Sequence, residues 1–408
     1  MRYRLTYSKR QRHAQVLTPP ALADLLVRSI GGSPGASWLE LGCGTGRIVD
    51  ACHRVAAPSQ YVGVELDARF LEQCAAPPSV QLRQADVLRP RALAEALGNQ
   101  LFDRVCANPP YGMAALRSES QVRLAELCPG IAQVKNWVQL DVYFILESLS
   151  RLRCPGEAAF IVGAPVAQDI RLRAFRKALC EQASEIECYE LPARAFERAA
   201  EVQAYLLIAR FASSKSCKVT VGRLQDGTDS LDTAVRISVD AAIDRLDFAH
   251  HHFVKLDSKL RGVAGCMSLR DLGAVVVRGS RTRAQFESMG VEHFHTTDFP
   301  RGTSEFAFGE SRDHGFNAAC AGDVLLPRVG TRCLDRQGVV ASGRRHFTEA
   351  VYRLRVPKSQ SRRVVEWVTG ELGSVWRQAA AKGSCAKHVT VKSLLEMPVL
   401  RRGERLGV

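Results

Sequence analysis

The sequence lacks the features that mark membrane and secreted proteins. No stretch approaches the roughly 18 consecutive apolar residues of a membrane span. The basic residues 1–17 are not followed by the apolar segment of a signal peptide. We therefore expect a cytoplasmic protein with no membrane partner.

The sequence also lacks the cysteine spacing of zinc clusters and disulfide frameworks. Its 13 cysteines include no Cys-x-x-Cys pair, so we expect reduced and mostly buried thiols. The histidines of 249–253, with His293 and His295, have no matching Cys or carboxylate partners in sequence, and no metal site is expected. A P-loop is excluded as well, because no Gly-Lys-Ser/Thr follows the Gly-rich segment at 42–46.

The net charge of +14 is concentrated in the C-terminal part of the chain. From Ala241 onward there are 27 Lys and Arg against 17 Asp and Glu, whereas the first 240 residues hold 29 against 25. A basic surface of this kind favours a long polyanion such as DNA or RNA, because neutralised phosphates release counterions. A solvated surface that serves only solubility is the alternative.

Short β-like runs alternate with helical stretches between Ser37 and Arg210, which predicts a doubly wound parallel sheet with helices on both faces. Beyond a polar segment at 212–230, short strand candidates are separated by glycines, and one helix is expected over 362–381. We therefore predict an α/β domain over 1–225 and a smaller mixed α+β domain over 240–408. Upstream, the segment 17–30 predicts a helix with Thr18 as N-cap and Pro19 at the first helical position.

A Gly-rich turn follows the first expected strand, in "LELGCGTG" at 39–46. Gly42, Gly44 and Gly46 let the backbone turn sharply and approach a ligand closely. Glu65 ends the next strand about twenty residues later, where a carboxylate accepts hydrogen bonds from ribose hydroxyls. Asp86 ends the strand after that and can accept from an adenine amino group. Together these positions indicate a nucleoside-binding site.

The segment "NPPY", 108–111, ends a fourth strand beside the same crevice. Asn108 offers a side-chain carbonyl oxygen, and Pro109 has a carbonyl but no N–H, so the local character is that of a hydrogen-bond acceptor. Two acceptors that converge on an NH2 group can orient it and draw its nitrogen away from planarity. Tyr111 offers a face on which a planar base can stack.

With these motifs, the sequence resembles the amino-group methyltransferases that use S-adenosylmethionine. Within them it is similar to DNA N6-adenine methyltransferases of the gamma arrangement, in which cofactor motifs precede the catalytic motif and a C-terminal target-recognition domain. The resemblance implies a Rossmann-like fold, S-adenosylmethionine as cofactor and double-stranded DNA as partner. A cognate restriction nuclease or other defence subunits would be further partners, in restriction-modification or phage defence.

The resemblance also implies roles for individual residues. The implied cofactor-binding residues are Thr18, Glu40, Gly42, Gly44, Gly46, Glu65 and Asp86. The implied catalytic residues are Asn108, Pro109, Pro110 and Tyr111, with Phe196 as the aromatic that closes the other side of a flipped adenine. Asp141 and Phe144 fall at a weaker cofactor-contacting motif, where a buried helix is an equal expectation.

The C-terminal part resembles target-recognition and specificity domains more loosely. Its candidate DNA-binding residues are Arg278, Arg281, Arg283, Arg328 and Arg332. The same chemistry on an RNA adenine or on a protein glutamine remains open, as does a DNA-binding specificity or defence subunit whose core is inactive. Intact Asn108, Tyr111, Glu65 and Asp86 argue against the last of these.

Overall fold

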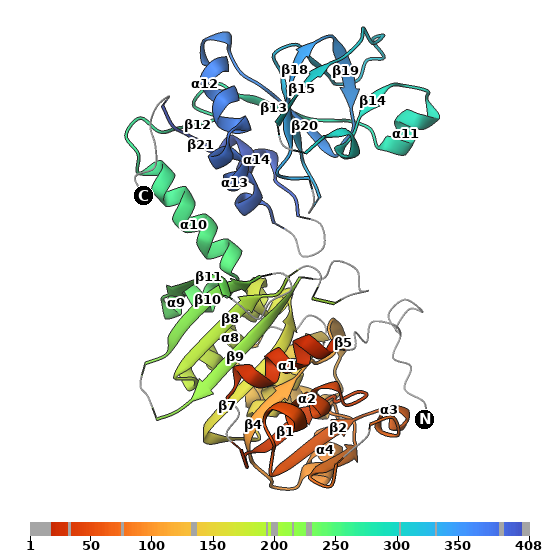
Figure 1. Ribbon diagram of the computed structural model, residues 1–408, viewed down its shortest axis with the longest axis vertical. Helices are drawn as coiled ribbons and strands as arrows, with labels where there is room; N and C mark the ends of the chain where they lie inside the picture. The colour runs from red at the N-terminus through yellow and green to blue at the C-terminus, as the bar shows by residue number, and fades with distance from the viewer. Residues whose placement is uncertain are drawn as a thin grey trace. The chain divides into compact units, whose positions relative to one another are not determined.

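The computed structural model divides the chain into two compact units, Met1–Phe248 and Ala249–Val408 (Figure 1). The residues it describes are 18–31, 34–74, 77–131, 137–192, 195–196, 203–213, 216–225, 231–301, 303–330, 333–382 and 387–401. The sequence places the domain change between 225 and 240. In the structure, strand β11 (Leu231–Ile237) belongs to the sheet of the first unit, and the division lies at Phe248.

A nine-stranded sheet forms the centre of the first unit, in the order β11-β10-β8-β9-β7-β4-β1-β2-β3. All strands run in one direction except β9 and β11. The strand bounds are β1 Ser37–Leu41, β2 Gln60–Glu65, β3 Val80–Gln84, β4 Phe102–Ala107, β7 Leu152–Gly163, β8 Glu185–Glu190, β9 Ala204–Phe211 and β10 Lys218–Leu224. β5 (Met113–Ala115) and β6 (Trp137–Gln139) form a separate pair. The first unit is thus the doubly wound, Rossmann-like α/β fold that the sequence predicts.

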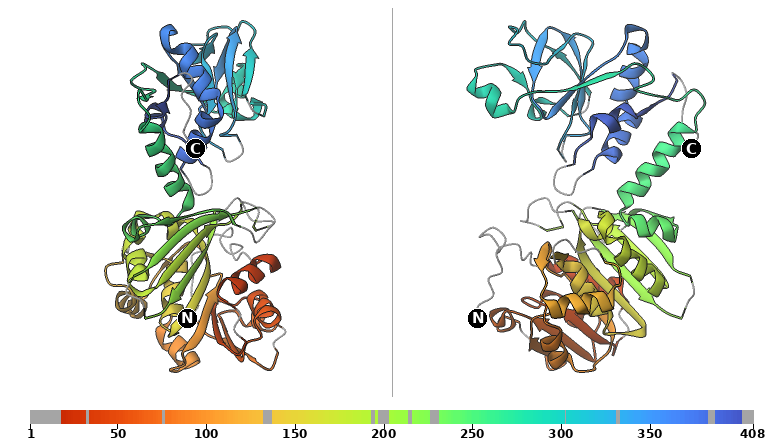
Figure 2. Two further views of the ribbon diagram at one scale, coloured as in Figure 1. Left: turned by 60° about the vertical axis from the view of Figure 1, so that its left-hand side comes forward. Right: turned by 180° about the vertical axis from the view of Figure 1, so that it is seen from behind.

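Helices cover both faces of this sheet. Along β1, Trp38 lies in one buried cluster with residues of α1 (Pro20–Ser29) and α2 (Arg47–Val55). Leu39 and Leu41 lie in the other cluster, with residues of α4 (Pro90–Leu97), α5 (Ser118–Leu127), α6 (Leu140–Leu149) and α8 (Arg173–Gln182). Figure 1 shows α1 and α2 in front of the sheet, and the view from behind in Figure 2 shows orange and yellow helices on the opposite face. The remaining helical elements are α3 (Ala68–Leu71), α7 (Ala164–Gln168), the 3-10 turn η2 (Ile170–Leu172) and α9 (Val239–Asp244).

Helix α1 begins one residue later than the sequence predicts. Pro19 is the N-cap, with an extended backbone at ψ 147°, and Pro20 occupies the first helical position. A residue that precedes proline is pushed away from helical geometry, so Pro20 keeps Pro19 out of the helix. Thr18 therefore lies outside the helix, and its side chain does not serve as the cap.

The second unit is a smaller mixed α+β fold. It contains a five-stranded sheet in the order β13-β20-β17-β18-β15, a three-stranded sheet β14-β19-β16 and the pair β12-β21. The strand bounds are β12 Met267–Ser268, β13 Val275–Arg278, β14 His293–Phe294, β15 Thr303–Ala307, β16 Ala318–Cys320, β17 Val324–Pro327, β18 Gln337–Ser342, β19 Arg344–Phe347, β20 Val351–Arg355 and β21 Pro398–Val399. The helical elements are α10 Phe248–Arg261, α11 Arg283–Ser288, η3 Thr296–Asp298, α12 Lys358–Thr369, α13 Glu371–Ala380 and α14 Val391–Leu395.

The helix expected over 362–381 is two helices, α12 and α13, separated at Gly370. Gly370 has an extended backbone, with ψ 170°. At Gly373 a Cβ would lie 2.2 Å from the carbonyl oxygen of Trp367, so the second helix packs tightly against the end of the first. Across the described ranges of both units, no helix has the length and apolar character that crossing a bilayer demands.

Candidate active site

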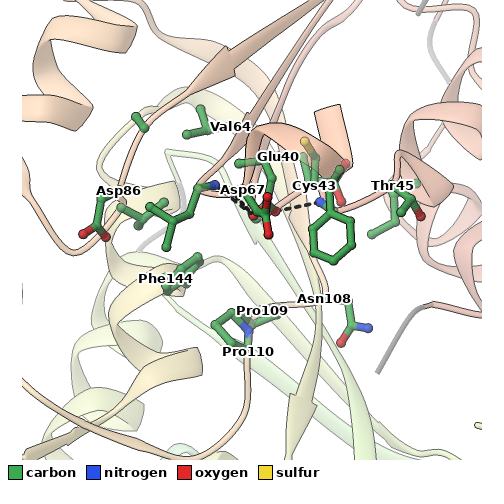
Figure 3. Close-up of a pocket in the computed structure, with 18 of the residues that line it drawn as sticks. Glu40, Cys43, Thr45, Val64, Asp67, Asp86, Asn108, Pro109, Pro110 and Phe144 are labelled. Carbon is green, nitrogen blue, oxygen red and sulfur yellow. Dashed lines mark hydrogen bonds between the residues drawn. The ribbon is translucent and has the colours of Figure 1, made fainter. Parts of the chain in front are cut away.

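A cavity of about 760 Å³ opens at the carboxyl ends of β1, β2, β3 and β4. The strand order reverses between β1 and β4, and ligands of open α/β sheets bind outside the strand ends at such a point. Figure 3 shows Asp86 and Asn108 far apart along this cavity, with Phe144 and the two prolines between them in that view. The predicted site residues that line the cavity are Thr18, Glu40, Gly42, Gly44, Glu65, Asp86, Asn108, Pro109, Pro110 and Tyr111.

The Gly-rich turn after β1 needs glycine for two different reasons. Gly42, Gly44 and Gly46 all have positive φ, at 83°, 54° and 81°, a region that residues with a Cβ rarely adopt. A Cβ on Gly42 would also lie 3.3 Å from the Phe144 ring, and one on Gly46 would lie 2.2 Å from Cys74 Sγ. Gly46 is the N-cap of α2 rather than a wall of the cavity. The turn therefore keeps the cavity floor open and starts α2 beside it.

Glu65, the last residue of β2, is buried and fixed by three backbone N–H groups. Its Oε2 accepts from Gly44 N over 2.9 Å, and its Oε1 accepts from Leu66 N and Asp67 N over 2.8 and 3.0 Å. A carboxylate has about four acceptor sites, so the group retains capacity for a ligand. The side chain is thus held in place as an acceptor that lines the cavity.

Asp86 follows β3 and is anchored in a similar way. Its Oδ1 accepts from Leu88 N over 3.0 Å, and its Oδ2 lies 3.7 Å from Arg89 Nε. These local contacts fix the direction of the carboxylate while leaving it partly exposed to the cavity. Glu65 and Asp86 are therefore two fixed acceptors at the ends of neighbouring strands.

Glu40 lies within β1 and is buried beneath the Gly-rich turn. Burial raises the pKa of its carboxyl from 4.5 to about 8, while a hydrogen bond from the Tyr61 hydroxyl opposes the rise and the charge of Glu65 adds to it. The Tyr61 hydroxyl, from β2, also lies 3.8 Å from Cys106 Sγ of β4, across the intervening strand β1. Cys106 is fully buried, in keeping with a core rather than a nucleophilic role.

Asn108 follows β4 directly, and its amide contacts two hydroxyl groups. Asn108 Nδ2 donates to Thr18 Oγ1 over 3.0 Å, and the Tyr111 hydroxyl donates to Asn108 Oδ1 over 2.7 Å. The Tyr111 ring packs against the buried cluster that contains α1 and α2. The motif therefore lines the cavity as a rigid, internally bonded turn.

Phe144 also lines the cavity, from α6. Sequence reasoning could not choose between a buried helix and a cofactor contact here, because both require an apolar residue. The neighbouring Asp141 is fully buried and accepts from Gly163 N over 3.1 Å, so it joins α6 to the end of β7. Other lining residues that the sequence did not single out include Cys43, Leu66, Phe70, Gln84 and Leu140.

Phe196 is buried in the same cluster as α1 and α2 and does not line the described cavity. Its neighbours 193–194 and 197–202 lie outside the described residues. Its expected place against a target base thus stays a prediction.

The predicted DNA-binding arginines of the second unit differ in what they contact. Arg278 and Arg328 both donate to the carbonyl oxygen of Glu349, and Arg278 also pairs with its carboxylate. Arg283 pairs with Glu287 one turn along α11, whereas the Arg281 guanidinium lies 5.2 Å above the Phe316 ring. Arg332 lies outside the described residues.

Side chains that could share a metal ion do not gather among the described residues, where no group of three or more His, Cys, Asp or Glu has a suitable arrangement. The cavity is lined by the anchored carboxylates of Glu65 and Asp86 and by the Asn-Pro-Pro-Tyr turn, and also by Glu40, Asp67, Arg47 and Arg69. Such a set suits a nucleoside and an amino group side by side.

Parts of the chain are similar in sequence to type II methyltransferases. No protein-family model matches the chain. The type II methyltransferase M.CvrRI of Paramecium bursaria Chlorella virus XZ-6E is 27% identical over 108 residues, which make up 26% of this chain and 27% of the relative. The type II methyltransferase M.TthHB8I of Thermus thermophilus is 29% identical over 156 residues, or 37% of this chain and 34% of the relative. The matches thus span about a third or less of each relative's length.

Among solved structures, the type IIG restriction endonuclease BpuSI matches 96% of this chain and 59% of its own, with a TM-score of 0.50. Sequence identity over that match is 11%, so the likeness concerns the fold alone. The match extends over both compact units of the chain. Both relatives that match by sequence are type II methyltransferases.

Proposed function

We propose that the chain is a DNA methyltransferase that moves a methyl group from S-adenosylmethionine to N6 of an adenine within a specific sequence. One observation carries the proposal: Asn108, Pro109, Pro110 and Tyr111 share a single cavity with the anchored carboxylates of Glu65 and Asp86. A nucleoside-containing cofactor and an amino group are then held side by side.

The residues of the cavity fit S-adenosylmethionine. Glu65 would accept hydrogen bonds from the ribose hydroxyls, and Asp86 would accept from the adenine amino group. Gly42 leaves space where a Cβ would approach Phe144 to 3.3 Å, and a volume of about 760 Å³ is ample for a ligand of this size. Bound S-adenosylmethionine would supply a methyl group on a sulfonium, which is activated towards attack by an amine.

Asn108 and Pro109 would prepare the attacking amine. The Asn108 amide oxygen and the Pro109 carbonyl would accept the two hydrogens of the N6 amino group and draw its nitrogen out of conjugation with the ring. The reaction is a direct displacement that needs no covalent enzyme intermediate, so the protein's contribution is positioning and electrostatics. Tyr111 is the proposed stacking face for the base, and Phe196 the proposed second aromatic.

A base within a duplex would have to leave the helix to enter this cavity, at a cost of a few kcal/mol for unstacking and unpairing. The excess of basic residues after Ala241 would offset this cost through phosphate contacts, and base-edge contacts would select the sequence. This basic segment favours DNA over a protein glutamine substrate, which would not need it. DNA and a nuclease or other defence subunit are thus the proposed partners.

The proposal is tested by incubating the purified chain with S-adenosylmethionine labelled in the methyl group and, in parallel, with DNA, RNA and protein. Mass spectrometry of the digested products then identifies the modified atom. We expect N6-methyladenine in DNA alone. Label in RNA adenine or in protein glutamine would show that DNA is not the substrate. Label in none of the three would contradict the proposal that the chain is an active methyltransferase.

A further inference from the structure

Two hydroxyl groups hold the Asn108 amide from its opposite ends. Asn108 Nδ2 donates to Thr18 Oγ1 over 3.0 Å, and the Tyr111 hydroxyl donates to Asn108 Oδ1 over 2.7 Å. Thr18 is buried and lies 90 residues before Asn108 in the chain, just ahead of α1. The contact therefore ties the amide to a separate part of the fold.

The orientation of this amide decides what a substrate meets. The two ends of an asparagine side chain are nearly equal in shape, but a half-turn exchanges the acceptor oxygen for the donor NH2. A target amino group donates hydrogens, so only the amide oxygen can bind it. With the amide turned the other way, two NH2 groups would face each other and the recognition would be lost.

The two hydroxyl groups are chemically suited to the orientation that is seen. A phenol, with an ordinary pKa of about 10, is a stronger hydrogen-bond donor than an aliphatic hydroxyl, and the aliphatic oxygen is the better acceptor. Tyr111 accordingly donates to Oδ1, and Thr18 accepts from Nδ2. The Tyr111 hydroxyl has a single proton, and the Ile161 carbonyl oxygen of β7 is its more distant alternative acceptor, at 3.4 Å.

We propose that Thr18 is a positioning residue whose hydroxyl fixes the Asn108 amide with Oδ1 available to the target amine. This inference rests on the proposed methyl transfer and adds to it a residue outside the Asn-Pro-Pro-Tyr motif. A Thr18 that only contacts the cofactor would govern cofactor affinity. A Thr18 that orients Asn108 governs the rate of transfer from the filled site.

The test compares Thr18→Val, which keeps the shape and removes the hydroxyl, with Thr18→Ser, which keeps the hydroxyl. The dissociation constant of S-adenosylmethionine is measured by calorimetry. The single-turnover rate is measured at saturating cofactor on a duplex that carries the site methylated by the parent. Thr18→Ala serves as a second hydroxyl-free variant if the valine prevents folding.

We expect the single-turnover rate of Thr18→Val to fall by about tenfold, the order of effect of one lost hydrogen bond, with a nearly unchanged cofactor dissociation constant. Thr18→Ser should restore the rate. A weaker cofactor affinity with an unchanged rate at saturation would overturn the positioning role, as would equal losses in the valine and serine variants. A parent that methylates no DNA would instead overturn the proposed function, and the role of Thr18 with it.

Discussion

At the scale of single residues, Asn108 is the group on which the proposed chemistry depends most. Its amide oxygen accepts from Tyr111 beside the cavity, whereas Glu65 and Asp86 lie at the ends of β2 and β3. Recognition of the amine and binding of the cofactor are thus assigned to different side chains. A substitution at Asn108 should therefore separate the two functions.

Asn108→Ala should abolish methyl transfer, because it removes the proposed acceptor of the target amine. The dissociation constant of S-adenosylmethionine should stay within about tenfold of the parent value, since the substitution removes at most one hydrogen bond to the cofactor. Transfer of labelled methyl groups and calorimetry measure the two quantities. Near-normal turnover in this variant would remove Asn108 from the catalytic assignment.

Glu40 should make stability depend on pH, because burial raises its pKa from the ordinary 4.5 to about 8. Between about pH 4.5 and 8, the folded protein therefore holds a proton that the unfolded chain has released. The stabilisation that the Glu40 carboxyl contributes is fully present below about pH 4.5 and is lost as the pH rises to about 8. At about 1.4 kcal/mol per pKa unit, the loss is on the order of 5 kcal/mol.

Glu40→Gln should abolish this dependence, since a neutral amide does not titrate. Relative to the parent, the variant should gain stability as the pH rises from about 5 to 8, the range over which the carboxyl of the unfolded parent is ionised. Urea unfolding of the parent and of Glu40→Gln at several pH values measures this. Parallel stability curves for parent and Glu40→Gln would show that Glu40 is ionised throughout.

At the scale of elements, the turn from β1 into α2 depends on glycine. Gly46→Ala meets both a φ of +81° and a Cβ position 2.2 Å from Cys74 Sγ, whereas Gly44→Ala meets a φ of +54° with nothing within 4 Å. The αL conformation costs about 1–2 kcal/mol for a residue with a Cβ, and overpacking adds about 1–3 kcal/mol. Gly46→Ala should therefore lower the free energy of unfolding more than Gly44→Ala. Equal effects in denaturant titrations would mean that Cys74 moves aside freely.

The sequence predicted the mostly parallel sheet and the placing of Glu65, Asp86 and Asn108 at successive strand ends, because hydrophobic runs and turn residues report local geometry directly. It did not predict the start of α1, where Pro20 excludes Pro19 from the helix, or the break at Gly370. It also did not predict the hydrogen bond between Thr18 and Asn108, or decide whether Phe144 lines the cavity or belongs to the core. Those contacts depend on how distant segments pack, which no local pattern encodes.

At the scale of the whole molecule, the basic excess of the C-terminal part has to act through cations that are available to phosphates. Arg278 and Arg328 are engaged by Glu349, and Arg283 pairs with Glu287. Within the described part of the second unit, no carboxylate pairs with Arg281, which is exposed and stacks over Phe316. Arg281 is therefore the strongest candidate of the four for a DNA contact.

Arg281→Ala should weaken DNA binding and reduce the slope of log affinity against log salt by about 1, as loss of one phosphate contact requires. Arg283→Ala is the matched control nearby in the chain, and it should have a smaller effect because its charge is already paired. Fluorescence anisotropy at several salt concentrations measures both variants. Equal slopes for Arg281→Ala and the parent would remove Arg281 from the interface.

Adenine methylation by this chain is tested most directly by expressing it in a host that lacks its own adenine methylation. That host's DNA is then sequenced by a single-molecule method that detects modified bases. Expression of Asn108→Ala is the control. We expect N6-methyladenine at one short sequence motif with the parent and none with the variant. Unmodified DNA with the folded parent, or the same modification with Asn108→Ala, would contradict it.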